Sequence, residues 1–359
     1  MPELAGPPGL STLANAGTTP SQRRFAAAVA TAFGLLTLAL LPIVAEPVGA
    51  MPGFVPSYQA ALTTVYAVTS YLFFAQYRRT RSVPLLVLAA GSLFTTLIVA
   101  VQLLSFPGLF GQGRIVGSGP GTTTWLWTLW HVGPPLFALP YAIMEGDGRP
   151  RLVPRARVGA VGGLTALAVA AVVGALSWIV VGYVDYLPRS VEGDNYWLLT
   201  TSGVGPAVVL LTVTALVTLC WRTRLRTVLQ LWLAVSLLLL VFDNLITLPG
   251  AARGTVGWFA GRLEALAAGI VVLAVYLREV DVLYGAAEAA ALHSERQRAE
   301  LEIARDNVAI ALEAADMGNW TLDLRTGASV RTLRHDRIFG YESLLPRWGL
   351  SDFLEHVAV

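Results

Sequence analysis

Residues 256–284 read VGWFAGRLEALAAGIVVLAVYLREVDVLY. The part from Val256 to Tyr276 carries only two charged side chains, Arg262 and Glu264. A helix needs about 20 predominantly apolar residues to cross a bilayer. No Gly or Pro interrupts the second half of the stretch, which ends in the charged sequence REVD before VLY. The stretch therefore predicts a membrane-spanning helix that continues without a break into a water-facing helix.

The composition places most of the chain in the same apolar environment. Of 359 residues, 55% are hydrophobic and 13% are charged, whereas soluble domains contain about 25% charged residues. The charges are densest after residue 277. The composition therefore disfavours an ordinary soluble enzyme, and the chain is expected to have a membrane part and a water-facing part.

Eight apolar stretches are long enough to cross a membrane, and Gly, Pro or charged residues separate them. The predicted spans are Phe25–Ala45, Ser57–Gln76, Pro84–Leu104, Thr123–Met144, Gly159–Val181, Leu198–Cys220, Val228–Leu248 and Val256–Tyr276. The first follows Arg23 and Arg24 as a signal peptide would, but its apolar run exceeds the usual core of about 7–15 residues. We therefore interpret it as a retained helix.

The arginines predict the orientation, because cationic loops are held on the cytoplasmic side. Thirteen arginines fall in one set of alternate loops and three in the other. The larger set is Arg23, Arg24, Arg78, Arg79, Arg81, Arg149, Arg151, Arg155, Arg157, Arg222, Arg224, Arg226 and Arg278, and the smaller is Arg114, Arg189 and Arg253. A multi-pass protein of the bacterial inner (plasma) membrane is expected, with both termini in the cytoplasm.

Ionisable side chains inside the predicted spans mark a candidate site, because they are costly in a membrane unless they face a partner or a cavity. Trp127, Trp130 and His131 stand at i, i+3 and i+4, so they share one side of a helix. The candidate ligand-binding residues are Trp127, Trp130, His131, Asp243, Arg262 and Glu264. One interpretation is an Asp243–Arg262 ion pair that only fixes helix packing. The other is a pocket, open to the outer side, for a small polar or anionic ligand.

The sequence identifies no cofactor, metal site or catalytic residue. All 25 basic residues are Arg, so there is no lysine to form a Schiff base with retinal. The single Cys220 excludes metal sites held by several cysteines. His131 is the only histidine in a predicted span, so a haem with two histidine ligands from one chain is excluded.

The region after the last span predicts a helical linker and then a different fold. Residues 278–310 favour helix, with a partly apolar heptad through Val280, Leu301 and Val308 that indicates only a weak coiled coil. From residue 311 onward, alternation at Trp320–Leu324, a turn, and a second run at Val330–Leu333 predict two strands. Short helices are expected at His335–Phe339 and Ser351–His356. The last 49 residues therefore read as the opening of an α/β domain.

Several spaced motifs resemble a known family of membrane sensors. They are FPGLF at 106–110, WHVGPP within 125–141, GWFAGR at 257–262 and LREVDVLY at 277–284. Over about residues 25–284 the chain resembles the fourth class of bacterial membrane-associated sensor (MASE) domains. The resemblance implies an integral membrane sensor.

The C-terminal stretch resembles the first half of a PAS domain through ALEAADMGNW, LDLRTG and HDRIFGYE. With PRWGLSDFLEHV, the stretch is most similar to PAS modules of sensor histidine kinases in two-component systems. A diguanylate cyclase is the second choice for the parent protein. The resemblance also implies a homodimer. No nucleic-acid partner is expected.

Together these patterns predict a mainly α protein with four segments: a cytoplasmic tail (1–24), an eight-helix membrane sensor domain (25–277), a helical signalling linker (278–310) and a truncated PAS domain (311–359). The favoured function is the input module of a membrane sensor, with the lipid bilayer and an unknown small ligand as partners. A small-solute transporter is the competing class. Its support is the pair of helix breaks at Pro134 with Pro135 and at Gly205 with Pro206.

Overall fold

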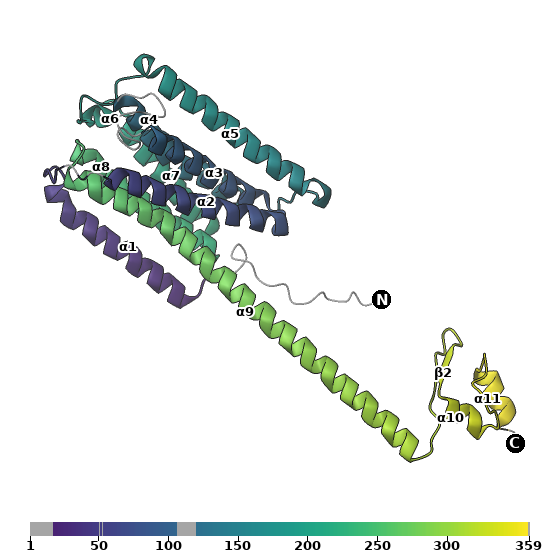
Figure 1. The fold of residues 1–359 in the computed structure, drawn as a ribbon. Helices are drawn as coiled ribbons and strands as arrows, with labels where there is room; N and C mark the ends of the chain where they lie inside the picture. Colours follow the sequence, from purple (N-terminus) through teal and green to yellow (C-terminus); the bar gives the residue numbers. More distant parts are fainter. Residues whose placement is uncertain (1–16, 50, 52, 106–119, 358–359) are drawn as a thin grey trace. The chain divides into compact units, whose positions relative to one another are not determined.

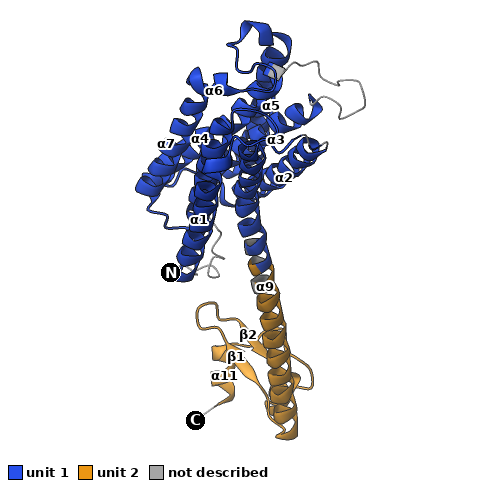
Figure 2. Ribbon diagram, turned by 90° about the vertical axis from the view of Figure 1, so that its left-hand side faces the viewer, with its two compact units in different colours: residues 1–281 blue, residues 282–359 orange. Residues whose placement is uncertain are grey.

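The computed structural model describes residues 17–49, 51, 53–105 and 120–357. The chain divides into two compact units, residues 1–281 and residues 282–359 (Figure 2). The FPGLF motif at 106–110 and most of the predicted N-terminal tail lie outside the described residues.

The first unit is a bundle of α-helices (Figure 1). Its helices are α1 (Pro20–Leu40), α2 (Phe54–Thr80), α3 (Val83–Leu104), α4 (Pro120–Gly146), α5 (Val158–Gly182), α6 (Trp197–Thr201), α7 (Val204–Thr223), α8 (Val228–Gly250) and the first part of α9 (Val256–Ala314). Short 3₁₀ turns occur at Leu41–Ile43, Arg155–Arg157 and Val184–Tyr186.

Six of the described helices are long and apolar enough to cross a membrane: α1, α3, α5, α7, α8 and the start of α9. Of the eight predicted spans, these six are confirmed by length and composition. The other two, α2 and α4, each have 27 residues but no stretch that reaches the hydropathy of the six. On α2 the polar residues Gln59, Thr69, Ser70 and Gln76 are buried, so the interior of the bundle shields them.

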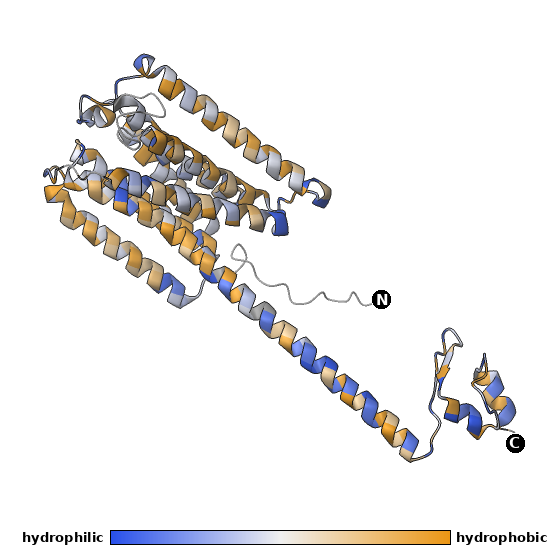
Figure 3. Ribbon diagram, in the orientation of Figure 1, coloured by the Kyte–Doolittle hydropathy of each residue, from blue (hydrophilic) through white to orange (hydrophobic). Residues whose placement is uncertain are grey.

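The bundle is apolar on its outside as well as in its core. Along α5 the side chains of Leu164, Leu167 and Trp178 are about 70% exposed, and α1 and α5 are predominantly orange in Figure 3. By contrast α8 is buried along most of its length and contacts α1, α4, α6 and α7. Exposed apolar side chains on long helices are the surface that a lipid bilayer covers.

The predicted start of the span Leu198–Cys220 is wrong, because the long helix does not begin at Leu198. The structure divides it into α6 and α7, with Gly203 between them at φ +82°. Only glycine adopts this left-handed conformation without steric cost. The long helix therefore starts at Val204, inside the predicted range.

The predicted continuous helix after the last span is confirmed. Helix α9 runs from Val256 to Ala314, a total of 59 residues. In Figure 3 it changes from mostly orange to a mixture with blue along its length. The described side chains between residues 288 and 310 are exposed, as expected for a solvated helix.

The second unit contains a two-stranded sheet and two short helices. Strands β1 (Trp320–Leu322) and β2 (Ser329–Arg331) pair antiparallel, with Thr321 opposite Val330. Helices α10 (Leu333–Ile338) and α11 (Leu350–His356) follow. The Asp323 carboxylate accepts the backbone N–H of Arg325 at 2.8 Å, and such Asx turns reverse a chain. The two strands and two helices expected from the sequence are present, within two residues of their predicted bounds.

One fully buried carboxylate, that of Asp336, joins the elements of the second unit. It accepts hydrogen bonds from Arg331 Nε at 2.7 Å, from the Leu345 backbone N–H at 2.8 Å and from His335 Nδ1 at 3.0 Å. Arg331 also donates to the carbonyl of Leu345, and its guanidinium lies 5.8 Å from the ring centre of Trp348. These contacts tie β2, α10 and the segment before α11 together.

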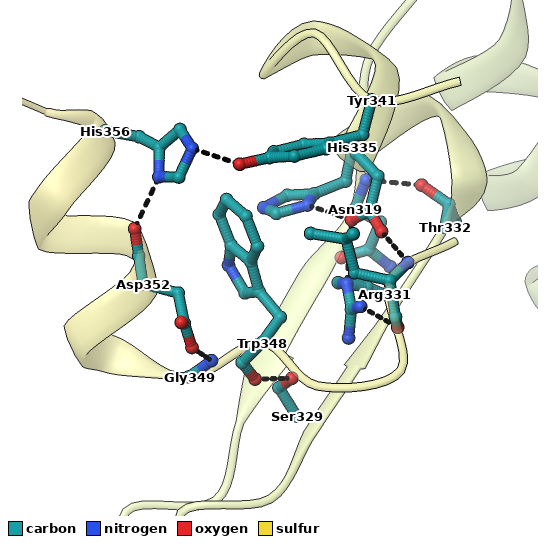
Figure 4. Close-up of polar contacts among 12 residues, drawn as sticks. Asn319, Ser329, Arg331, Thr332, His335, Tyr341, Trp348, Gly349, Asp352 and His356 are labelled. Atoms are coloured by element: carbon teal, nitrogen blue, oxygen red, sulfur yellow. Dashed lines mark hydrogen bonds and ion pairs between the residues drawn. The ribbon is translucent and has the colours of Figure 1, made fainter. Parts of the chain in front are cut away.

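A second polar contact closes the same unit around the buried Trp348 (Figure 4). Nδ1 of His356 donates to the Asp352 carbonyl at 2.7 Å, so Nε2 can accept the hydroxyl hydrogen of Tyr341, also at 2.7 Å. The imidazole of His356 is therefore satisfied in its neutral form. It holds α11 against the segment that follows α10.

We expect the second unit to lose structure in acid through Asp336. Burial alone raises the pKa of this carboxyl, but hydrogen bonds from Arg331, Leu345 and His335 outweigh it and lower the pKa from 3.8 to about 2. A lowered pKa stabilises the fold above pH 3.8, and this contribution is lost as the pH falls through about 2. Hydrogen exchange in residues 320–356, corrected for intrinsic rates, should accelerate between pH 4 and 2. The variant D336N should lack this step, and an unchanged acid profile in D336N would contradict the assignment.

Candidate functional site

A cavity of about 510 Å³ opens at one end of the helical bundle. It lies where the α1–α2 connection, the start of α4, the segment before α6 and the α8–α9 turn meet. Its lining combines aromatic rings, amides, hydroxyls and three charged side chains. The residues are Pro47, Gly49, Met51, Gly53, Val55, Pro56, Gln59, Gln102, Thr123, Thr124, Trp127, Asp194, Tyr196, Leu199, Thr247, Arg253, Gly254, Trp258, Phe259 and Arg262.

Backbone hydrogen bonds fix the rim of this cavity. The α8–α9 turn pairs on one side with the α1–α2 connection, where Val48 N–H donates to the Gly254 carbonyl at 2.8 Å. On the other side Tyr196 N–H donates to the Ala251 carbonyl at 2.7 Å. The turn thus holds two segments that are distant in sequence, and backbone hydrogen bonds link all three parts of the rim.

Arg253, on the rim, is bound to neighbouring groups. Its guanidinium donates to the Thr123 hydroxyl at 2.9 Å and lies 3.6 Å from an Asp194 carboxylate oxygen. Its backbone N–H also donates to the Asp194 carbonyl at 3.0 Å. Arg253 therefore connects the start of α4 and the segment before α6 to the α8–α9 turn.

Arg262 lies on the cavity wall without an acidic partner among the described residues. Its guanidinium carbon is 3.8 Å from the centre of the Trp258 ring, and Nη1 donates to the Trp258 carbonyl at 2.7 Å. The predicted Asp243–Arg262 ion pair is not formed. Both contacts of Arg262 are to its own helix, one turn earlier, because residues four apart are neighbours on a helix.

Asp243 instead binds His131, between α8 and α4. Nε2 of His131 lies 2.7 Å from Oδ2 of Asp243, and the two side chains are 1–2% exposed. The imidazole lies against two tryptophan rings, with centroids 3.8 Å from Trp127 and 3.6 Å from Trp130. Oδ1 of Asp243 accepts the hydroxyl of Thr247 at 2.8 Å. Both carboxylate oxygens are therefore satisfied.

The hydrogen bonds determine where protons sit in this pair. Nδ1 of His131 lies 2.8 Å from the Trp127 carbonyl, which can only accept, so Nδ1 carries a hydrogen. One further proton is shared between Nε2 and the Asp243 carboxylate. Whether it resides on nitrogen or oxygen, the pair as a whole has no net charge.

Glu264 is separate from the cavity. It is buried, with Oε1 accepting the hydroxyl of Thr37 on α1 at 2.9 Å and Oε2 without a partner among the described residues. Of the six predicted site residues, Trp127 and Arg262 line the cavity. Three others lie behind the cavity wall: His131 and Trp130 next to Trp127, and Asp243 next to Thr247. Glu264 faces α1 instead.

Two glycines bring α9 close to α8 at this depth. A Cβ at Gly261 would overlap the Thr247 hydroxyl and the Asp243 carboxylate, and a Cβ at Gly257 would overlap the Ile246 carbonyl. Small residues four apart allow helices in membranes to approach closely. This spacing places the wall that carries Arg262 next to the His131–Asp243 pair.

The contribution of α2 to the cavity was not predicted from the sequence. Gln59 lines the cavity, is 3% exposed, and its Oε1 has no hydrogen-bond partner among the described residues. The neighbouring Tyr58 hydroxyl is also buried and unpartnered in that part of the chain, and lies within electrostatic range of Arg262. The signal was present, because an amide in a predicted span is as costly as other unpaired polar groups.

Comparison with known proteins identifies one family. The sequence model of MASE4, described as "Membrane-associated sensor, integral membrane domain", matches residues 49–284. The match covers α2 to α8 and the first part of α9, which contain the whole of the His131–Asp243 pair and most of the cavity lining. No curated protein and no solved structure matches the chain.

We expect the stability of the bundle to depend on the partner that His131 finds. In D243A both the Nε2 atom of His131 and the Thr247 hydroxyl lose their hydrogen-bond partner, which should cost about 3 kcal/mol of unfolding free energy. In D243N the amide can donate to Nε2 and still accept from Thr247, so a cost of about 1 kcal/mol is expected. Unfolding titrations of the chain in lipid nanodiscs would measure both. D185A, at an exposed position in the 3₁₀ turn Val184–Tyr186, is the control, and a D243A effect no larger than that of D185A would contradict the pairing.

Proposed function

Because the chain belongs to the MASE4 family of membrane-associated sensors, we propose that it is the membrane-embedded input module of a bacterial signal-transduction protein. The observation that carries the proposal is the continuity of α9. The same helix supplies Trp258, Phe259 and Arg262 to the cavity wall and extends to Ala314. An input site and an output helix are thus parts of one element.

The proposed input site is the cavity together with the charged residues beside it. Arg262 and Trp127 contact the ligand, His131 and Asp243 support the cavity wall from behind, and Trp130 packs on His131. Glu264 links α9 to α1 through Thr37 and would respond to movement of α9. No metal or cofactor is assigned to the site.

The proposed relay is a shift between two positions of α9 relative to α8. A ligand changes such an equilibrium only by its difference in affinity for the two states. Arg262 on α9 and Thr247 on α8 both line the cavity, so an occupant contacts both helices. Their close contact at Gly261 favours two discrete packings over a continuous deformation, because protein interiors are close-packed.

We propose eight membrane crossings with both termini in the cytoplasm of a bacterium, at its inner membrane. Helices α2 and α4 each extend about 40 Å at 1.5 Å per residue, which exceeds the hydrocarbon core of about 30 Å. Their buried polar side chains account for their lower apolarity. The cavity would then open to the outer side of the membrane.

The proposed output lies beyond α9. The stretch 311–359 is similar to the first half of a PAS domain, and 278–310 would be the signalling linker of a homodimer. A histidine kinase of a two-component system is the favoured parent, on the style of residues 334–356. A diguanylate cyclase is the alternative. The hairpin, α10 and α11 are compatible with either parent.

The orientation predicts where reporters will be active. Green fluorescent protein fused after Val359 should fluoresce, because it folds in the cytoplasm. Alkaline phosphatase fused there should be inactive, because it is active only outside the cytoplasm. Fusions within residues 187–193, in a predicted outer loop, should give the reverse result. An active phosphatase after Val359 would place the second unit outside the cell and refute the proposed signalling role.

The relay predicts that a packing change at Gly261 reaches residues beyond the bundle. In G261A the added Cβ must push α9 away from Thr247 and Asp243. Amide exchange between residues 290 and 310, measured on the chain in nanodiscs, should change by about fivefold or more. G174A on α5 is the matched control, because a Cβ there meets nothing within 4 Å. A change confined to α8 and the start of α9 would show that the bundle does not communicate along α9.

A further inference from the structure

We propose that the cavity binds a small aromatic monocarboxylate, whose carboxylate pairs with Arg262. The inference rests on the proposed function only in treating the cavity as the input site. It goes further by naming the chemical class of the ligand. Charge, hydrogen-bonding capacity and the shape of the lining each point to this class.

The charges of the lining require an anion with a single charge. The described lining contains Asp194, Arg253 and Arg262 as its charged residues. Arg253 is paired with Asp194 at 3.6 Å, which leaves one excess positive charge on Arg262. The nearby Asp243 is already engaged by His131 and Thr247. A carboxylate balances this charge, whereas a phosphate monoester brings about −1.5 to −2 charges and overcompensates it.

The guanidinium of Arg262 is held in a suitable orientation for a carboxylate. Stacking on Trp258 and the bond from Nη1 to the Trp258 carbonyl restrict its rotation. A guanidinium has five N–H donors in a planar fork, and that bond is the one that Arg262 makes among the described residues. The remaining donors can form the parallel pair of bonds that carboxylates accept.

The rest of the lining fits an aromatic body. The side chains of Trp127, Tyr196, Trp258 and Phe259 line the cavity, and aromatic rings prefer offset or edge contacts with other rings. A volume of about 510 Å³ lies within the range of about 300–1,000 Å³ for small-molecule sites. The cavity therefore accepts a ring together with its carboxylate.

The unpartnered amide of Gln59 is an independent sign that a polar ligand completes the site. Its side chain is 97% buried, lines the cavity, and leaves Oε1 without a hydrogen-bond partner among the described residues. Buried amide oxygens are nearly always hydrogen-bonded in proteins. An ionised carboxylate only accepts hydrogen bonds, so the missing donor comes from a water bound with the ligand or from a ring N–H such as that of an indole.

Binding to the full chain in lipid nanodiscs tests the proposal directly. Benzoate, phenylacetate and indole-3-acetate would be titrated by calorimetry, each beside its neutral amide, together with acetate and phenyl phosphate. At least one aromatic carboxylate should bind saturably. Its amide, acetate and phenyl phosphate should each bind at least about tenfold more weakly, because each lacks the ring or the single charge.

Two variants identify the anchoring residue. R262Q should weaken binding of the carboxylate by about tenfold or more and should abolish the preference over the amide. R189Q removes a charge from an exposed loop position outside the cavity lining and should leave the affinity unchanged. The comparison of acid with amide on the unaltered chain needs no variant, so the test survives if R262Q fails to fold.

The outcomes separate this inference from the proposed function. Equal affinity for acid and amide, stronger binding of phenyl phosphate, full affinity in R262Q, or binding by none of the three carboxylates would each overturn it. Binding of the carboxylate without any change in exchange between residues 290 and 310 would retain the ligand class and reject the signalling role. A change in exchange in G261A without carboxylate binding would retain the signalling role and reject the ligand class.

Discussion

A hydrogen bond buried between two helices, from His131 on α4 to Asp243 on α8, is the interaction on which the polar interior of this bundle depends. In a membrane no water is available to satisfy polar groups, so partners must come from within the protein. Here each ring nitrogen and each carboxylate oxygen has a partner. Nδ1 contacts the Trp127 carbonyl, Nε2 contacts Oδ2, and Oδ1 accepts the Thr247 hydroxyl. The pair thereby fixes α4 against α8 and the cavity wall between them.

The same pairing gives the cavity its charge. Because Asp243 is neutralised by His131, Arg262 one helix away has no acidic partner in the described part of the chain, and stacking on Trp258 compensates it only in part. A cation–π contact contributes about 0.5–2 kcal/mol, less than a buried charge costs to desolvate. Arg262 is therefore a cation on the cavity wall without an acidic partner among the described residues, and the proposed anionic ligand would stabilise it there.

The sequence was sufficient for features that depend on local patterns and insufficient for those that depend on which helices are neighbours. Apolar length predicted most of the long helices, the absence of Gly and Pro predicted the continuity of α9, and alternation predicted the hairpin at Trp320. The partner of Asp243 could not be predicted, because His131, Arg262 and Glu264 lie at similar depth and only helix order and rotation select among them. The break at Gly203 was missed because Leu198 and Leu199 were counted with the apolar run that begins at Val204.

The strength of the available contacts limits how far apart the two signalling states can be. One charge-assisted hydrogen-bonded contact that exists in one state only contributes about 1.5–3 kcal/mol, a shift of roughly ten- to 150-fold in an equilibrium. A full switch from 1:99 to 99:1 needs about 5.5 kcal/mol. A site with one unpaired arginine therefore cannot drive a complete transition alone. One solution is a resting equilibrium in which the two packings of α9 differ by no more than about 3 kcal/mol. The other is that two copies of the chain respond together, which doubles the coupling free energy along α9.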